Sequence, residues 1–595
     1  VVDFKAAVDG SGDLTVTAGT GNIQFGGGIG VSSVDSAGSL VFESSGTTTF
    51  AGAIFAGDLT TDATGTTHLD GGAVTTTTTQ TFNDAIELGA NTVLTGSTIT
   101  TNDTVDGSGS YSLDVSGDAV FGDGAGDSIT GVTTLGVSGT TTINTNTITS
   151  SGVQSFTGAV TLGETTTLTT TDANVTFNST VNSNSASTEG LTVSAGEGEI
   201  SASGDIGTGS SGDLGSISLT AATINLQDVT TTGTQTYTGA ITTNSTYTSD
   251  GSDISFTGNL VHNDALAVDT GAGAGTITFG GTVDSANGET NNLTLTAGTG
   301  NIDFDNTVGA TDSIGDLLIN SANSATADNT IDVSSFTQLA GTGTTTLSGN
   351  LTAFGSNASG DAVDITAADI SLPGITVDAS SGSGDVAFNE PVTIGGVGTT
   401  TTVRTGSGDI SFAGTLDGAS GDLTLDTDGT ATITFTGNVG ETGRLDTIWI
   451  EDAGSIVGGA SGGSSIDAEA FGANVAQSLT LDNTANDLDV LAVGLDAGSD
   501  LTYVDSNGVQ IGVVGTGDKT VTGLTGGESG GDTSDFSLTL KGLDSGGTAA
   551  LTQASGAVIS TPGLLTIDTT QYSGGSSAEL TNADVNGTLL GDTPI

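Results

Sequence analysis

A stretch of twelve residues that occurs twice is the feature that most constrains the fold. Residues 293–304 read LTLTAGTGNIDF, and residues 14–25 match them at ten of the twelve positions. In the later copy, Leu293 and Leu295 alternate with threonines, and a period of two places both leucines on one face of a β-strand. A strand that is apolar on one face must cover that face with another layer. The chain is therefore predicted to reuse one small β unit.

The second half of this unit predicts a corner and another strand. Gly298 and Gly300 give the backbone freedom for the corner, because glycine reaches positive φ without a steric cost at Cβ. Ile302 and Phe304 then point inward, and Asp303 between them points to water. We expect the stretch to form most of one coil, with these residues in its core: Leu293, Leu295, Ile302, Phe304 and Val308.

A Val/Ile-x-Phe pattern marks further copies of the unit. Where copies are consecutive, as from Phe4 to Phe25 or from Phe388 to Phe412 and Phe435, the interval between them is nearly constant. A period near 23 lies in the range of solenoid repeats. The copies are Val2–Phe4, Ile23–Phe25, Val175–Phe177, Ile254–Phe256, Ile277–Phe279, Ile302–Phe304, Val386–Phe388, Ile410–Phe412 and Ile433–Phe435.

A second motif appears at 80–89 (QTFNDAIELG), 154–163 (QSFTGAVTLG) and 235–244 (QTYTGAITTN). Its wider spacing leaves open a string of β-sandwich domains, since a sandwich needs about 100 residues. The shorter repeat is too small to be a domain, and it favours an all-β, right-handed parallel β-helix (β-solenoid) of roughly 23-residue coils. A chain of 595 residues then gives about 25 coils, with Phe stacked over Phe or Ile.

The texture of the sequence changes near residue 440, where Phe becomes rarer. We expect residues 1–440 to form a β-solenoid with the Ile/Val-x-Phe repeat, and 441–595 to continue it with a second repeat texture. The Gly/Ser-rich stretch 458–465 is interpreted as a loop on one coil. Only residues 467–478 resemble a short helix. The chain opens inside a repeat, which predicts a segment of a longer protein or a piece that associates end to end.

The charge and the cysteine count exclude several classes of protein. With 68 acidic and 5 basic residues, the formal net charge is −63, so binding to nucleic acid, which needs clustered Lys or Arg, is excluded. An anionic membrane surface is disfavoured for the same reason, and no stretch predicts membrane insertion. The absence of Cys excludes disulfides and thiolate metal sites, which fits an exported protein held together by backbone pairing.

The residues that catalysis would need are sparse. Lyases and hydrolases on this scaffold need carboxylates beside a basic group, and the basic residues Lys5, Arg404, Arg444, Lys519 and Lys541 are scattered. His68 and His262 each have a nearby Asp but no second His, and they are interpreted as surface strand residues. Trp449, the single tryptophan, is expected in the core or at a shielded edge. No catalytic residues are predicted.

Asp-rich turns are the candidates for a metal site. Ca²⁺ prefers carboxylate and carbonyl oxygens, and Asp426 and Asp428, followed by Gly429, form the best local candidate. The stretches 103–106 and 123–127 rank behind it. None of these stretches has a complete twelve-residue calcium loop, so a plain polar turn remains the alternative for each. The acidity of the whole chain is also explained by solubility or by a salty habitat.

Threonine-rich runs such as 75–79 and 165–171 suit the solvent-facing side of strands. They would form an ice-binding array only if they stacked in register on one face of the solenoid. Their irregular placement in the sequence argues against such stacking.

Several stretches resemble the repeat regions of filamentous haemagglutinin-like exoproteins, which are giant bacterial surface adhesins. They are LTVTAGTGNIQF at 14–25, QSFTGAVTLG at 154–163, LTQASGAVISTPGLLTIDT at 551–569 and ELTNADVNGTL at 579–589. The resemblance implies a right-handed β-helix, export across the outer membrane, and a role in adhesion, aggregation or biofilm structure.

These observations predict a non-enzymatic, extracellular structural or adhesive protein at the bacterial cell surface, a β-helical stalk or filament segment. Expected partners are further copies of the chain, end to end or side by side, and a surface glycan or cell receptor. The alternatives are a polysaccharide-binding or polysaccharide-cleaving β-helix, and a surface-layer component stabilised by Ca²⁺.

Overall fold

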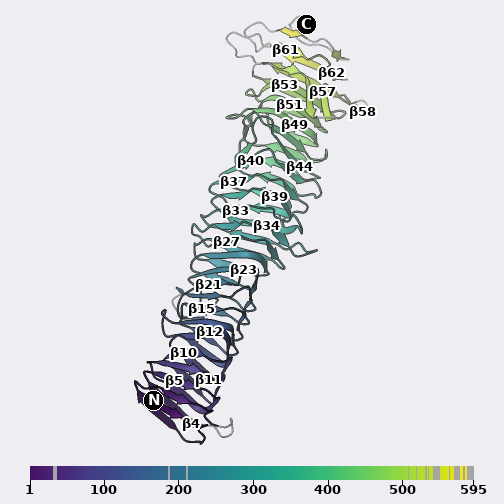
Figure 1. The fold of residues 1–595 in the computed structure, drawn as a ribbon. Helices are drawn as coiled ribbons and strands as arrows, with labels where there is room; N and C mark the ends of the chain where they lie inside the picture. Colours follow the sequence, from purple (N-terminus) through teal and green to yellow (C-terminus); the bar gives the residue numbers. More distant parts are fainter. Residues whose placement is uncertain are drawn as a thin grey trace. The chain divides into compact units, whose positions relative to one another are not determined.

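The computed structural model is all-β. It describes residues 1–30, 37–184, 188–208, 212–506, 508–516, 519–529, 532–533, 535–540, 550–561, 563–568, 577–579 and 583–585. These residues form strands and turns without a helix, so they include no helix that could cross a membrane. Parallel strands stack in about 23 turns of a β-solenoid, which confirms the predicted fold. The chain divides into two compact units, Val1–Gly281 and Thr282–Ile595. Figure 1 shows the strands of each unit.

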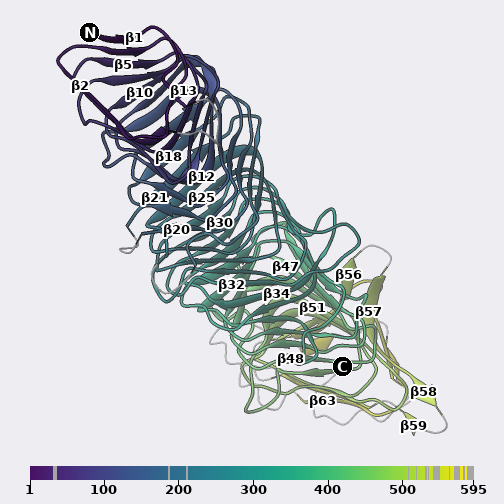
Figure 2. The same cartoon turned by 90° about the horizontal axis from the view of Figure 1, so that it is seen from below.

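Each regular coil of the first unit has three sides. One coil contains the strands β16 (Gln154–Phe156), β17 (Val160–Leu162) and β18 (Thr166–Thr169), and the next contains β19 (Val175–Phe177), β20 (Val181–Ser183) and β21 (Gly190–Ser194). β16 pairs in parallel with β19, β17 with β20, and β18 with β21. Figure 2 shows successive coils of this unit following one another. The parallel pairings exclude a string of antiparallel sandwiches over these coils.

Inward residues stay paired with inward residues of the next coil although the coil length varies and some strand pairs contain a β-bulge. Val193 pairs with Leu219, and Leu219 pairs with Tyr237, so the second of these coils is much shorter than the first. In the second unit, the coil that separates Val439 from its bridge partner Ile466 is longer than either. The predicted period near 23 therefore describes an average. The corner loops absorb the length differences, because the strands must stay aligned for every backbone N–H and C=O group to find a partner.

Aromatic residues stack on one another inside the solenoid. In the first unit the rings of Phe4 and Phe25 lie 4.5 Å apart at an interplanar angle of 2°. In the second unit, the ring centroids of Phe388 and Phe412 are 5.2 Å apart, and those of Phe412 and Phe435 are 5.5 Å apart. The predicted stacking of Phe over Phe is confirmed. Such offset ring pairs add to the stabilisation from apolar burial.

The repeated stretch has the predicted arrangement. Its strands β32 (Leu293–Thr296) and β33 (Ile302–Phe304) occupy two sides of a coil, and Val308 bridges to Ile331 on the third side. Its five predicted core residues are all buried. Gly298 has φ 56°, a conformation that glycine adopts at little cost.

The second motif begins with a glutamine that is buried at a corner. The Nε2 atom of Gln80 donates to the carbonyl oxygens of Val74 at 3.0 Å and Thr95 at 2.8 Å. Gln154 donates to the carbonyl oxygen of Thr169 at 3.0 Å, and Gln235 to that of Thr248 at 2.7 Å. Buried carbonyl groups at a corner need such partners. The motif therefore recurs where a glutamine side chain satisfies the backbone of a corner.

The one helix-like stretch of the sequence is a strand. β51 (Asp467–Val475) pairs in parallel with β49 (Leu445–Ala453) and with β53 (Asp487–Leu495). The helix prediction is wrong because tertiary pairing on both sides outweighs local propensity. The stretch 458–465 lies between strands as turns and bends, as predicted for a loop.

A β-hairpin covers part of the outer surface of the second unit. Its strands β56 (Val513–Thr516) and β57 (Lys519–Gly526) pair antiparallel. Trp449 points outward, because its neighbours Ile448 and Ile450 fill the core, and it packs with Val514 and Val521 of the hairpin. The expectation of a shielded tryptophan is confirmed, and a short outer core explains the shielding.

Removing one ring from the aromatic stack tests the core. We expect Phe412→Ala to lower the free energy of unfolding by about 3–5 kcal/mol, because the cavity would lie between Phe388 and Phe435. Val397 is 82 % exposed, so Val397→Ala should change the free energy of unfolding by less than about 0.5 kcal/mol. Urea denaturation of the two variants measures both, and equal losses would contradict this account of the core.

Candidate functional site

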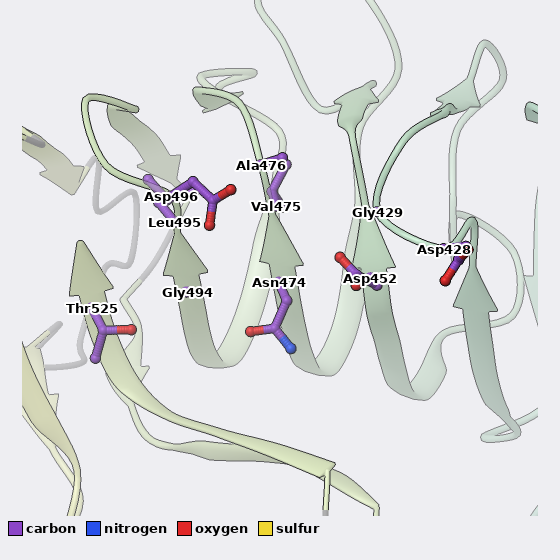
Figure 3. A pocket seen from close by; sticks show the side chains of 10 residues that line it. All are labelled: Asp428, Gly429, Asp452, Asn474, Val475, Ala476, Gly494, Leu495, Asp496 and Thr525. Carbon is purple, nitrogen blue, oxygen red and sulfur yellow. The ribbon is translucent and has the colours of Figure 1, made fainter. Parts of the chain in front are cut away.

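An acidic groove of about 520 Å³ lies at the ends of neighbouring strands of the second unit (Figure 3). Asp428 and Gly429 follow β47 (Asp422–Asp426), Asp452 lies in β49, Asn474 in β51, and Asp496 follows β53. Thr525 of β57 is the last of the lining residues that have a polar side chain. The groove contains Asp428, one of the two predicted calcium ligands, and Asp426 lies in register with Asp452.

The turn that carries Asp428 is fixed by local hydrogen bonds. The backbone N–H of Asp428 donates to Oδ1 of Asp426 at 3.1 Å, and Asp428 has φ 53°. Aspartate tolerates this left-handed conformation better than most residues. The buried Thr427 donates its backbone N–H to the carbonyl oxygen of Asp452 at 3.0 Å, which seats the turn on the next coil.

The carboxylates of the groove repel one another. Partial burial raises the pKa of Asp452, and the negative charges of Asp426, Asp428 and Asp496 raise it further. A cation in the groove would relieve this repulsion. Among the described residues, however, no three Asp, Glu or His side chains are placed to hold a metal ion together. The chemistry of these residues suits Ca²⁺, and the closed ligand set that a tight site needs is not formed.

The other acidic candidates cap their own turns. Oδ1 of Asp106 accepts the N–H of Ser108 at 2.7 Å, and Oδ2 of Asp127 accepts the N–H of Asp123 at 2.9 Å. Oδ1 of Asp103 accepts the N–H of Thr104 at 2.6 Å. For 123–127 these bonds match the alternative interpretation as a polar turn. Asp106 instead lies at the start of β12 (Val105–Phe121), where Ser108 and Gly109 have positive φ.

The two histidines differ from each other. His68 lies on the outer face of β7 (Thr66–Leu69), with Nε2 3.0 Å from Oε2 of Glu87, as expected for a surface residue. His262 is buried, so its prediction as a surface residue is wrong. It occupies an inward position of β28 (Leu260–His262), and its Nδ1 lies 3.0 Å from the carbonyl oxygen of Asp264.

Arg444 joins the acidic side chains of neighbouring coils. Its Nε atom is 2.5 Å from Oδ1 of Asp467, and its Nη1 and Nη2 atoms are each 3.1 Å from the carboxylate of Asp489. Partial burial lowers the pKa of Arg444, but the hydrogen bonds and charges of Asp489 and Asp467 outweigh this effect and raise it. The guanidinium group thus stays charged and holds the coils together.

Two of the remaining basic residues pair with carboxylates that do not line the groove. Lys5 pairs with Asp3, and Lys519 pairs with Glu451. Arg404 is aligned between Asp378 and Asp426 on neighbouring strands. Lys541 lies outside the described residues.

A buried carboxylate in the first unit was not predicted. Asp84 is 2 % exposed, and it accepts hydrogen bonds from the hydroxyl groups of Thr61 at 2.6 Å and Thr67 at 3.0 Å. Burial raises its pKa to about 6. The alternation of inward and outward residues along a strand could have predicted this burial, because every second residue from Gln80 to Leu88 points inward.

Comparison of the chain with protein-family models, with characterised proteins and with solved structures gives no match. The resemblance to haemagglutinin-like exoproteins therefore stays a prediction from the sequence.

The titration of Asp84 predicts a pH-dependent stability. Its pKa of about 6 in the folded chain exceeds the ordinary value of 3.8, so folding binds a proton and stability falls as pH rises from about 4 to 6. We expect Asp84→Asn to raise the free energy of unfolding by up to about 3 kcal/mol at pH 7.5, with no gain at pH 4. The exposed Asp9→Asn controls for the lost charge, and urea denaturation across this pH range measures both. A gain for Asp84→Asn that does not change with pH would contradict the assignment.

Calcium should act through the acidic groove if the predicted ligands bind it. We expect Ca²⁺ at ten times its dissociation constant to stabilise the chain by about 1.4 kcal/mol, and Asp428→Asn and Asp452→Asn to reduce this gain. Asp9→Asn, in the other unit, is the matched control. Thermal unfolding with Ca²⁺ and with a chelator checks the prediction, and identical melting curves would remove calcium from the account.

Proposed function

We propose that this chain is a non-enzymatic, structural segment of an extracellular bacterial surface protein, a stalk or filament that carries or forms part of an adhesin. The observation that carries the proposal is the repeated use of one parallel pairing scheme within each unit. In such a solenoid each coil depends only on its neighbours, so the chain can be lengthened without a new fold.

The surface chemistry supports a role outside the cell. Acidic and hydroxyl side chains face outward while the aliphatic and aromatic residues fill the core, and the net charge of −63 keeps copies apart in solution. Stability comes from backbone ladders and packing, with no cysteine to depend on the redox state of the surroundings. Self-association and binding to a surface glycan or cell receptor are the interactions we propose for the assembled protein.

The acidic groove favours a second candidate, a surface-layer or adhesin segment that Ca²⁺ stiffens. Asp428, Asp452 and Asp496 line the groove from different coils. Partial burial and the repulsion between these carboxylates, which a cation would remove, raise the pKa of Asp452. The chelator experiment above separates this candidate from a stalk that needs no metal.

Immunogold electron microscopy of cells that produce the protein tests the proposed function. An antibody raised against residues 1–595 should label fibres or a layer on the intact cell surface, and deletion of the coding region should remove the label together with that structure. Label confined to the cell interior would contradict the proposal. Release of sugar fragments from a panel of polysaccharides by the purified chain would contradict its non-enzymatic part.

A further inference from the structure

Two columns of threonine and serine side chains cover the outer face of one side of the first unit, and we call them the hydroxyl array. This side contains β15 (Thr147–Ser150), β18, β21, β23 (Ser216–Leu226), β25 (Gln235–Thr243), β27 (Ile254–Phe256) and β30 (Ile277–Phe279). The first column is Thr147, Thr167, Thr192, Ser218, Thr236, Ser255 and Thr278; the second is Thr149, Thr169, Ser194, Thr220, Thr238 and Thr257.

Strand register places these side chains directly over one another. In the first column Thr167 pairs with Thr192, and Thr192 with Ser218. In the second, Ser194 pairs with Thr220, and the hydroxyl of Thr257 donates to that of Thr238 at 3.1 Å. Neighbouring strands are about 4.8 Å apart, and residues two apart along a strand are about 6.6 Å apart. The array is thus a two-dimensional lattice.

The irregular sequence spacing conceals this lattice. In the first column the step from Thr192 to Ser218 is a long one, whereas the next step, from Ser218 to Thr236, is short. These differences lie in the corner loops, while the Thr-x-Thr segments keep their register. The expectation that irregular placement prevents stacking is therefore wrong.

The hydroxyl groups of the array are available to solvent. All its members are exposed or partly exposed. Most of them make no side-chain hydrogen bond to any described residue; the exceptions are Thr147, Thr238 and Thr257. A hydroxyl group without an internal partner keeps one donor and two acceptor sites for a ligand.

Large buried residues support the array from below. Between the two columns, each strand turns one apolar side chain into the core, among them Leu219, Tyr237 and Phe256. The rings of Tyr237 and Phe256 stack at a centroid distance of 5.2 Å, and those of Phe256 and Phe279 at 5.3 Å. Side chains packed at crystal-like density hold their strands in place, so the lattice above them is pre-organised.

The uncharged composition of the array indicates an uncharged partner. No member is charged, although the chain carries 68 acidic residues, and on the same face of the preceding coils charged residues appear, such as Glu87 and Asp106. The aromatic residues of these coils, which would stack on sugar rings, are buried. A partner must instead match a regular grid of hydroxyl and methyl groups.

From these observations we infer that the hydroxyl array binds the surface of ice. Ice presents neutral oxygen atoms that donate and accept hydrogen bonds at repeats close to those of the array. Every lattice point of the array supplies a hydroxyl group, and the threonines, which are the majority, add a methyl group. The rigid support beneath lowers the entropic cost of ordering the side chains on binding. This inference is independent of the proposed role as a stalk.

Ice-affinity partitioning of the fluorescently labelled full chain tests the inference. A slowly growing ice hemisphere should take up the wild-type protein, and Thr192→Lys together with Thr220→Lys should reduce its uptake to the level of albumin, because two lysines disrupt the centre of the grid. The control is Thr176→Lys, at a partly exposed outward position of β19 on another side of the coil, and it should leave uptake unchanged. Circular dichroism should show the same β spectrum for all three proteins.

Other outcomes would overturn the inference. Wild-type protein excluded from ice, or array variants taken up as well as the wild type, would show that the array does not bind ice. Retention of the wild type on microcrystalline cellulose or chitin, with exclusion from ice, would identify a glycan surface as the partner instead. None of these outcomes bears on whether antibody labels fibres at the cell surface, so the two proposals fail separately.

Discussion

The parallel hydrogen-bond ladder between coils is the interaction on which the rest of the structure depends. Each strand satisfies its backbone groups with the strands before and after it, so the register between neighbours decides which side chains meet. A shift by one residue would exchange the core face and the solvent face of a strand. The same ladder therefore produces the stacked rings of Phe388 and Phe412 inside and the aligned hydroxyls of Thr167 and Thr192 outside.

The sequence was sufficient to predict the fold class and much of the core. The Val/Ile-x-Phe pattern predicted the core because its alternation of inward and outward residues is visible within three residues. The interval between consecutive copies corresponds to one coil. Gly298 was predictable because a corner needs positive φ. The groove was partly predictable, since Asp426 and Asp428 were candidates from their own spacing, but Asp452 and Asp496 join them only through stacking of later coils.

Features that depend on coil length were not predictable from a period. Loops of different length hide the register, so the hydroxyl array is irregular in sequence and regular in space. The helix expected at 467–478 failed because pairing with two neighbours overrides local propensity. His262 and Asp84 are buried at inward positions. Their residue types suggest exposure, and only the alternation of inward and outward residues along the strand indicates that they are buried.

The most direct test of the account measures the register itself. The chain has no native cysteine, so pairs of spin labels can be placed at Thr167 with Thr192, at Thr192 with Ser218, and at Thr167 with Ser218. Neighbouring coils are about 4.8 Å apart, so electron paramagnetic resonance should show strong dipolar broadening for the first two pairs and weaker broadening for the third. Three spectra without broadening, or with the same broadening, would contradict the in-register parallel stack.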